Sequence, residues 1–194
     1  KKLCCGRKFK DVSFYARYGE IVGFSGLVGA GRTEVMKGIF GILRTDSGSI
    51  CLDGKQIDIR RPRDAICAGI AYIPEDRKNE GLILINSVAF NMTLAALKEI
   101  IKGIRVNKKK RAEMVKHYVD AFSIKVTSGE QLVGNLSGGN QQKVVLGKWL
   151  ANKPKVIILD EPTRGIDVGS KSEIYRIVNQ LAGEGVSVIL VSSE

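Results

Sequence analysis

The chain has 194 residues, of which 44% are hydrophobic and 26% charged, and it carries a formal net charge of +11. This composition is typical of a single globular domain and excludes a disordered tail or a collagen-like fibre. No apolar run approaches the roughly 20 residues that span a bilayer, so we do not expect the chain itself to cross a membrane. No pair among its four cysteines has the spacing of a zinc site or a redox motif, which favours reduced thiols.

The first part of the chain alternates short apolar segments with turn signals. Strands are predicted over 11–15 and 20–24, joined by a turn at Tyr18-Gly19. A glycine-rich loop follows, and apolar residues at helical spacing then predict a helix that ends near Gly41.

The next segment adds a hairpin, a helix and a strand. Asp53-Gly54 is a tight turn signal and predicts a hairpin between strands over 50–52 and 57–59. A helix over 63–68 and a buried strand over 70–73 follow it.

The middle of the chain has a different spacing of apolar residues from its two ends. Helical periods over 88–101 and 111–122 replace the strand pattern and predict a separate helical lobe. The strand pattern returns at 156–159 and 186–191, with a helix over 171–181 between them. A strand, a helix and a strand in this order build a parallel sheet. Because the chain stops directly after a predicted core strand, we expect it to be a piece of a longer polypeptide.

The glycine-rich loop is a candidate phosphate-binding site. The segment from Gly26 to Thr33 fits the pattern G-x-x-x-x-G-K-[ST] at every position except one, because Arg32 stands where the lysine belongs. Glycines let the backbone wrap a phosphate with its N–H groups, and the following helix directs the positive end of its dipole at the same anion. The hydroxyl of Thr33 would bind Mg²⁺. The candidate residues are Gly26, Gly29, Ala30, Gly31, Arg32 and Thr33. A glycine-rich turn that binds nothing is the alternative.

The apolar strand over 156–159 ends in two carboxylates, Asp160 and Glu161. Ligands of open α/β folds bind at the carboxyl edge of the parallel sheet, where Asp160 could hold Mg²⁺. Glu161 could orient or deprotonate an attacking water in phosphoryl transfer. A surface pair that caps a strand is the alternative, but the upstream loop favours nucleotide chemistry.

A second anion-binding helix start is predicted at Ser137-Gly138-Gly139, which precedes an apolar-periodic helix over 144–150. Its serine hydroxyl, its free amides and the helix dipole would all face an anion. Since one loop already serves phosphate, a second such feature suggests a composite site. A simple serine N-cap would explain Ser137 but not the two glycines.

These segments together resemble a known family. The motif Leu136, Ser137, Gly138, Gly139, Asn140 and Gln141 resembles the signature of ATP-binding-cassette ATPases. The segment over 158–163 resembles their Walker B motif, and the segment that follows, with Asp167, resembles their D-loop. The resemblance covers the whole chain with the motifs in the correct order.

The resemblance implies an α/β fold of the P-loop NTPase class, with a mainly parallel sheet core, an N-terminal antiparallel β part and an inserted helical subdomain. It implies one truncated nucleotide-binding domain over residues 1–194. The core would comprise 1–75 and 137–194, and the helical subdomain about 76–136. ATP and Mg²⁺ are the implied cofactors.

Three segments, 26–34, 72–78 and 191–194, resemble the second cassette of monosaccharide importers. In that family, ATP binding and hydrolysis drive the uptake of ribose, galactose, xylose or similar sugars. The implied partners are a first cassette in the same polypeptide or as a dimer mate, transmembrane permease subunits, and a periplasmic or extracellular sugar-binding protein. The implied location is peripheral, on the cytoplasmic face of the cell membrane.

Three positions depart from the general cassette pattern. Arg32 replaces the Walker A lysine, Glu75 stands at the Q-loop glutamine, and Ser193 stands at the switch histidine. Cassettes work as head-to-tail pairs, with each ATP between the loop of one and the signature of the other. The three departures would therefore weaken one site, while the intact signature at 136–141 would complete the other. We predict that this half binds nucleotide more than it hydrolyses it.

A soluble cassette acting on nucleic acid or the ribosome is the alternative function, and the charge of +11 would suit it. The basic run 108–111 could contact phosphates, but such runs more often form a solvated loop and helix start. The interval 33–136 is too short for the coiled coil of DNA-repair relatives. We therefore favour the importer and expect no nucleic-acid partner. The apolar segments 82–85 and 90–92 are candidates for docking the permease.

Overall fold

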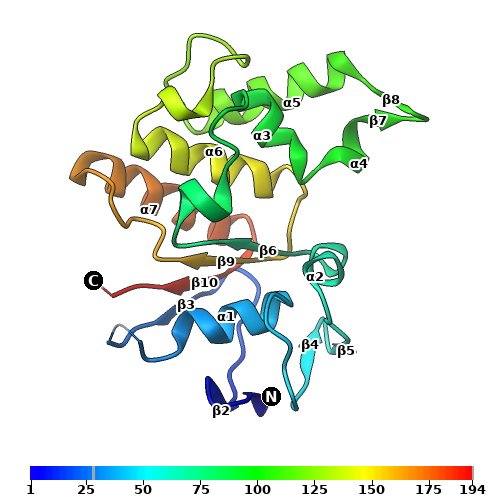
Figure 1. Ribbon diagram of the computed structural model, residues 1–194, viewed down its shortest axis with the longest axis vertical. Helices are drawn as coiled ribbons and strands as arrows, with labels where there is room; N and C mark the ends of the chain where they lie inside the picture. The colour runs from blue at the N-terminus through cyan, green and yellow to red at the C-terminus, as the bar shows by residue number, and fades with distance from the viewer. Residues whose placement is uncertain (28, 194) are drawn as a thin grey trace. The chain divides into compact units, whose positions relative to one another are not determined.

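The computed structural model describes residues 1–27 and 29–193. Val28, in the predicted phosphate loop, and Glu194, in the predicted switch segment, lie outside the described residues. The chain divides into two compact units, which are described separately (Figure 1). We call residues 1–72, 154–161 and 179–194 the sheet unit, and residues 73–153 and 162–178 the helical unit.

A four-stranded sheet with the order β3-β10-β9-β6 forms the centre of the sheet unit. Its strands are β3 (Ile21–Phe24), β10 (Ser187–Val191), β9 (Val156–Asp160) and β6 (Ile70–Ile73). β10 pairs in parallel with both β3 and β9. Val191 is in register with Phe24 on one side and with Asp160 on the other, so three strands end at one level. The residues that follow these strands therefore meet at the carboxyl edge of the sheet, as predicted for Asp160.

Three helices precede or follow strands of this sheet in the chain. α7 (Val168–Gly183) lies between β9 and β10 in the chain, which confirms the predicted strand-helix-strand unit. α1 (Arg32–Phe40) follows β3 and the glycine-rich loop, and it ends at Gly41, whose φ of 81° is left-handed. α2 (Pro62–Ala68) ends at Gly69 with a φ of 92°. Both helices end where the glycines predicted, because glycine adopts the left-handed conformation without a steric penalty.

Two short antiparallel pairs complete the sheet unit, and here two predictions were wrong. β2 (Phe9–Val12) replaces the predicted strand over 11–15 and pairs with β1 (Leu3–Cys5), not with the strand over 20–24. The reason is the turn at 6–8, which contains Gly6 with a φ of 50° and folds β2 back on β1.

The second wrong boundary lies in the predicted hairpin after Ser49. β4 (Ile50–Leu52) pairs with β5 (Lys55–Ile57), two residues earlier than the strand predicted over 57–59. Asp53 and Gly54 have φ values of 53° and 74°, so they form a two-residue turn with positive φ at both positions. Such a turn starts its second strand immediately after the glycine.

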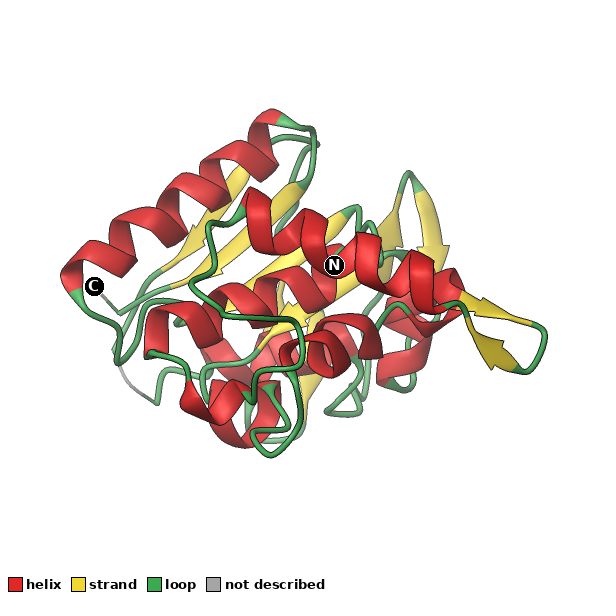
Figure 2. Cartoon of the chain, turned by 90° about the horizontal axis from the view of Figure 1, so that it is seen from above, coloured by secondary structure: helices red, strands yellow, loops and turns green. Residues whose placement is uncertain are grey.

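The helical unit contains the first part of α7, four further α-helices and several short elements among its described residues. The α-helices are α3 (Val88–Leu94), α4 (Leu97–Ile100), α5 (Lys108–Ala121) and α6 (Gly138–Leu150). The short elements are a π-helix (Arg77–Gly81), a 3-10 turn (Val133–Asn135), β7 (Ile101–Lys102) and β8 (Arg105–Val106). α3 packs against α5 and α6, and Val88 and Met92 of α3 and Val144 of α6 are fully buried. The β7–β8 hairpin extends away from these helices (Figures 1 and 2).

The single helix predicted over 88–101 was wrong, because α3 ends at Leu94 and α4 begins at Leu97. The Thr93 hydroxyl donates a hydrogen bond of 2.7 Å to the Ala89 carbonyl, a contact that often bends helices. Ile101 then leaves the helical conformation to pair with Val106 in the hairpin.

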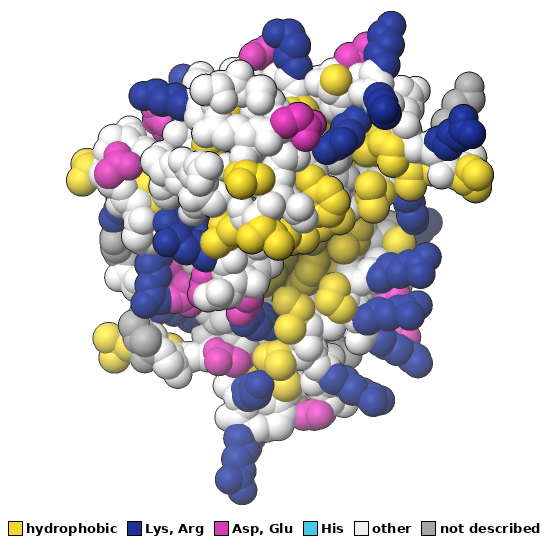
Figure 3. Space-filling model, turned by 45° about the horizontal axis from the view of Figure 1, so that its top comes forward, with side chains coloured by type: hydrophobic (Ala, Val, Ile, Leu, Met, Phe, Trp, Pro, Cys, Tyr) yellow, Lys and Arg dark blue, Asp and Glu magenta, His cyan; other side chains and the backbone are white. Residues whose placement is uncertain are grey.

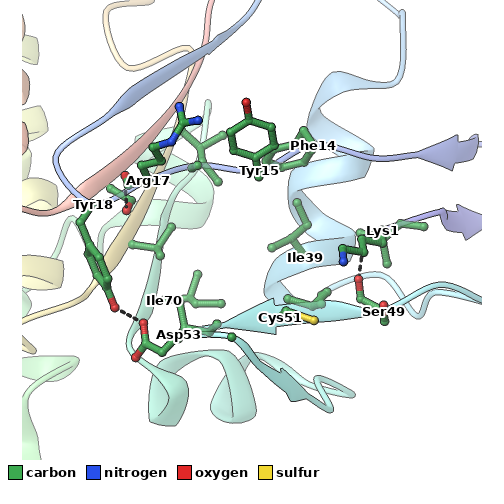
Figure 4. A pocket seen from close by; sticks show the side chains of 18 of the residues that line it. Lys1, Phe14, Tyr15, Arg17, Tyr18, Ile39, Ser49, Cys51, Asp53 and Ile70 are labelled. Carbon is green, nitrogen blue, oxygen red and sulfur yellow. Dashed lines mark hydrogen bonds between the residues drawn. The ribbon is translucent and has the colours of Figure 1, made fainter.

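The sheet unit also contains a cavity of about 460 Å³ with a mostly apolar lining (Figure 4). Phe14, Ile39 and Ile70 contribute to its wall, and Tyr18 donates a hydrogen bond to Asp53 at its edge. Its lining includes none of the residues predicted to bind ATP. Within residues 1–27 and 29–193, no helix has both the length and the apolarity that a membrane-spanning segment needs.

Candidate nucleotide-binding site

The predicted phosphate loop connects the end of β3 to the start of α1 in the sheet unit. Gly26, Gly29 and Gly31 have φ values of 154°, 84° and 82°, a region that side-chain-bearing residues rarely enter. At Gly31 a Cβ would also lie 3.0 Å from the Lys8 carbonyl oxygen. Ala30 donates its amide to the Leu27 carbonyl at 3.1 Å, which closes a turn within the loop. The loop therefore adopts a conformation that only glycines at these positions allow.

The start of α1 is suited to an anion. The first backbone amides of a helix have no partner within the helix, and the helix dipole is positive at this end. The N-cap position of α1 is Gly31, which brings no side chain to satisfy those amides. This geometry suits an anion, and phosphate binding by the loop stays a prediction.

Thr33 and Asp160, the two predicted magnesium ligands, lie together. The Thr33 hydroxyl donates a hydrogen bond of 3.1 Å to Oδ1 of Asp160. Tyr72, at the end of β6, donates one of 2.9 Å to Oδ2 of the same carboxylate. Asp160 is fully buried. The pKa of Asp160 is raised above its usual value, because the effect of burial exceeds the lowering by the hydrogen bonds from Tyr72 and Thr33.

This donor set fits Mg²⁺, which prefers oxygen ligands and is commonly held by one or two protein groups together with phosphate oxygens. In the part of the chain that the structure describes, no group of three or more His, Cys, Asp or Glu side chains could hold a metal ion alone.

Arg32 and Glu161 also meet, in a way the sequence did not predict. Nη2 of Arg32 lies 3.5 Å from Oε1 of Glu161, with only 12% and 11% of the two side chains exposed. Nη1 of Arg32 donates a hydrogen bond of 2.7 Å to the Ser192 carbonyl. The guanidinium at the lysine position of the loop is thus bonded to the candidate catalytic carboxylate and to the residue before Ser193. Ser193 itself is exposed.

The predicted signature lies at the start of α6 in the helical unit. Ser137 is the N-cap of α6, and the Asn140 side chain donates a hydrogen bond of 2.9 Å to its hydroxyl. Gly138 and Gly139 form the first turn. Leu136 is buried, and the buried Gln141 donates a hydrogen bond of 3.3 Å to the Val133 carbonyl. Ser137, Gly138 and Asn140 are therefore better placed than Leu136 and Gln141 to meet a ligand.

The remaining predicted residues, Glu75 and Asp167, are also in the helical unit. Glu75 forms an ion pair with Arg164, which precedes the D-loop aspartate. Asp167 accepts a hydrogen bond of 2.9 Å from the Ser170 amide at the start of α7. This bond and one from the Ser170 side chain lower the pKa of Asp167.

Tyr72 and Arg77 are the two site residues that sequence reasoning missed. A tyrosine in a buried strand signals a partner for its hydroxyl, so the signal for Tyr72 was present. Arg77 donates hydrogen bonds to the Arg164 and Gly165 carbonyls. No sequence pattern predicts bonds to backbone carbonyls so far along the chain.

The sheet order, the glycine-rich strand-to-helix loop and the Thr33–Asp160 pair define the class of the protein as a P-loop NTPase. A sequence profile described as "ABC transporter" matches residues 9–164. The chain belongs to the ABC transporter family, and its fold is the ATP-binding-cassette type of P-loop NTPase.

Several curated proteins are similar to the chain in sequence. It is 53% identical over 186 residues to the "Ribose import ATP-binding protein RbsA" of Lactococcus lactis subsp. cremoris, which covers 96% of this chain and 38% of that protein. It is 53% identical over 190 residues to the protein of the same name from Streptococcus agalactiae serotype III, covering 98% and 39%. The chain thus spans about two-fifths of the length of these relatives.

Solved structures show the same fold at lower identity. The cbiO1 protein of Clostridium perfringens, part of an ABC transporter complex, is 24% identical with a TM-score of 0.77, and the match covers 96% of this chain and 72% of that one. A dimeric bacterial ABC transporter cassette is 22% identical with a TM-score of 0.80, covering 96% and 80%.

Proposed function

We propose that the chain is the second nucleotide-binding cassette of an importer's ATP-binding protein, and that it couples ATP binding and hydrolysis to the uptake of a monosaccharide, with ribose as the first candidate. The observation that carries the proposal is the 53% identity over 96% of the chain to proteins named for ribose import. The glycine-rich loop and the Thr33–Asp160 pair supply a matching site.

The roles of the residues in the sheet unit follow from their positions. The amides of Gly29 and Gly31 would bind the phosphates, Ala30 would lie between them with its amide bonded to the Leu27 carbonyl, and Thr33 and Asp160 would hold Mg²⁺. A bound Mg²⁺ would neutralise charge that develops on the phosphates. Glu161 would orient a water for attack and accept its proton, the role of a carboxylate base.

The two cassettes of the importer would not be equivalent. Arg32, Glu75 and Ser193 would all belong to the ATP site formed by this cassette's loop, which would bind nucleotide more than it hydrolyses it. Ser137, Gly138 and the other signature residues would complete the site on the first cassette's loop. Support comes from the Arg32–Glu161 contact, which engages the candidate base in an ion pair.

The partners would be a permease in the membrane and a sugar-binding protein on its other side, with the cassette peripheral on the cytoplasmic face. Ile83, Ile85 and Phe90 of the helical unit are 38%, 83% and 39% exposed, and they are our candidates for the permease contact. Figure 3 shows lysines and arginines scattered over the surface in view.

Purification of the full-length protein with its partners tests the proposal. We expect co-purification from membranes with a permease, and ATP turnover in proteoliposomes that rises when ribose and its binding protein are added. Co-sedimentation with ribosomes and no membrane partner would instead support a soluble cassette that acts in translation. Turnover that rises with another sugar would keep the importer and correct the substrate.

A further inference from the structure

Arg77 occupies an unusual position in the helical unit. It is the first residue of the π-helix Arg77–Gly81, two residues after Glu75. Asp76 caps this π-helix, since its Oδ1 accepts hydrogen bonds of 3.0 Å from the amides of Lys78 and Asn79. The backbone that carries Arg77 is therefore held by its own local hydrogen bonds.

The guanidinium of Arg77 reaches a segment nearly ninety positions further along the chain. Nη1 donates a hydrogen bond of 2.8 Å to the Arg164 carbonyl, and Nη2 donates one of 3.1 Å to the Gly165 carbonyl. Both acceptors are backbone atoms just before Asp167. Because the planar guanidinium binds two consecutive carbonyls, it fixes the direction of the main chain there, as a single ammonium could not.

The same guanidinium lies against the signature. A Cβ placed on Gly138 would be 2.7 Å from Nη2 of Arg77 and 3.3 Å from the Gly165 carbonyl oxygen. Only glycine at position 138 leaves this space to the guanidinium. Arg77 therefore joins the segment 164–165 to the first residue of α6.

The contact is partly buried. Nε of Arg77 is inaccessible and has no hydrogen-bond partner among the described residues. Burial lowers the pKa of Arg77, but an arginine stays protonated in proteins, so the donors remain available. Glu75 forms its own ion pair with Arg164 beside this contact. Segments 75–77, 164–165 and 138 thus form one connected cluster, which we call the Arg77 cluster.

We propose that Arg77 is a positioning residue that holds the D-loop backbone against the start of the signature helix, so that both reach the partner cassette's nucleotide in a fixed relative geometry. The inference rests on the proposed function, because the partner's nucleotide is its setting. Arg77 would act through the backbone of residues 164–165 and through position 138.

Hydrogen exchange in the full-length protein tests the positioning directly. In Arg77→Ala, the amides of residues 164–170 should exchange at least tenfold faster, while those of β9 and β10 keep their wild-type rates. Arg77→Lys should restore less than half of the lost protection, since lysine cannot bind both carbonyls. Lys78→Ala, which removes an exposed cation from the same π-helix, is the matched control and should leave the exchange unchanged.

Turnover supplies the second readout, in full-length protein that carries Glu161→Gln so that hydrolysis belongs to the first cassette. Arg77→Ala should lower kcat at least tenfold and change KM for ATP less than threefold. The reason is that the substitution would disturb the position of the signature relative to the D-loop but leave the phosphate loops, which bind ATP, intact. Unchanged exchange at 164–170, or full recovery by lysine, would overturn the proposal. Failure of the proposed function is distinguishable, since the wild type would then not co-purify with a permease, while hydrogen exchange would still report on Arg77.

Discussion

Arg32 shows how a single residue changes what the phosphate loop can do. A lysine at this position would present a compact ammonium to a phosphate, whereas Arg32 donates a hydrogen bond to the Ser192 carbonyl and pairs with Glu161. A phosphate that drew the guanidinium toward itself would act against the ion pair with Glu161. Nucleotide and Glu161 therefore compete for Arg32.

This competition predicts that Glu161→Gln strengthens ADP binding to the chain. The substitution keeps the shape of the side chain but removes its charge, so Arg32 loses its ion pair and becomes available to a phosphate. We expect the Kd for Mg-ADP to fall by about three- to tenfold, which corresponds to roughly 0.7–1.4 kcal/mol. Isothermal titration calorimetry measures it, and ADP avoids any contribution from hydrolysis.

Two controls separate this effect from general repulsion between Glu161 and the nucleotide. Glu184→Gln, which removes an exposed carboxylate elsewhere in the sheet unit, should leave the Kd unchanged. In an Arg32→Ala background, Glu161→Gln should no longer improve binding, because the residue it releases is absent. An equal gain in both backgrounds would show that Arg32 is not the mediator.

At this scale the sequence predicted identities better than contacts. The motif spacing placed Thr33 and Asp160 together, because the loop that leads to Thr33 follows β3, Asp160 ends β9, and these two strands end at one level. It did not predict that Arg32 would face Glu161, since that contact depends on the direction of a long side chain. The hydrogen bonds from Arg77 to backbone carbonyls could not be predicted either, because every residue has a backbone carbonyl and the sequence does not show which one accepts a bond.

At the scale of elements, the two helix starts in the helical unit approach each other closely. Gly139, in the first turn of α6, is so near the first turn of α7 that an added Cβ would lie 2.3 Å from Oγ and 2.5 Å from Cβ of Ser170. The Ser170 backbone is itself held by its amide, which donates to Asp167. The space at Gly139 is therefore a packing requirement, independent of any ligand.

Gly139→Ala should consequently destabilise the chain by about 1–2 kcal/mol, since overpacking costs more than the gain in helix propensity. Urea unfolding of the 194-residue chain measures the change. In a Ser170→Gly background the loss should largely disappear. Gly183→Ala in α7 is the matched control, because nothing lies within 4 Å of the added Cβ, and its stability should not fall. A loss that persists without the Ser170 side chain would contradict this explanation.

Element prediction succeeded where the local signal and the long-range pairing agreed. β9 and β10 are apolar strands of ordinary length with the amphipathic helix α7 between them, and this order alone indicates a parallel pair. It failed at β1 and β2, where a strand of three residues carries too weak a pattern to reveal its partner. It also failed at α4, where Ile101 pairs with Val106 in preference to continuing a helix.

At the scale of the whole molecule, the cassette should act as one half of an unequal pair. Arg32, Glu75 and Ser193 all depart from the family pattern in the same proposed ATP site, while the signature that would serve the other site is intact. Glu161→Gln should therefore leave at least half of the ATP turnover of the full-length importer. The equivalent change in the first cassette should lower turnover at least a hundredfold, the contribution expected of a general base.

Ser137→Arg adds a third arm to this experiment, because it changes this chain but acts on the first cassette's site. A bulky cation at the N-cap of α6 would occupy the place of the nucleotide's phosphates, so turnover should fall as far as it does with the first cassette's carboxylate change. The three variants are compared as kcat in proteoliposomes with saturating ribose and binding protein. If Glu161→Gln and the first-cassette change cost the same activity, the two sites are equivalent and the asymmetry inferred from Arg32, Glu75 and Ser193 is wrong.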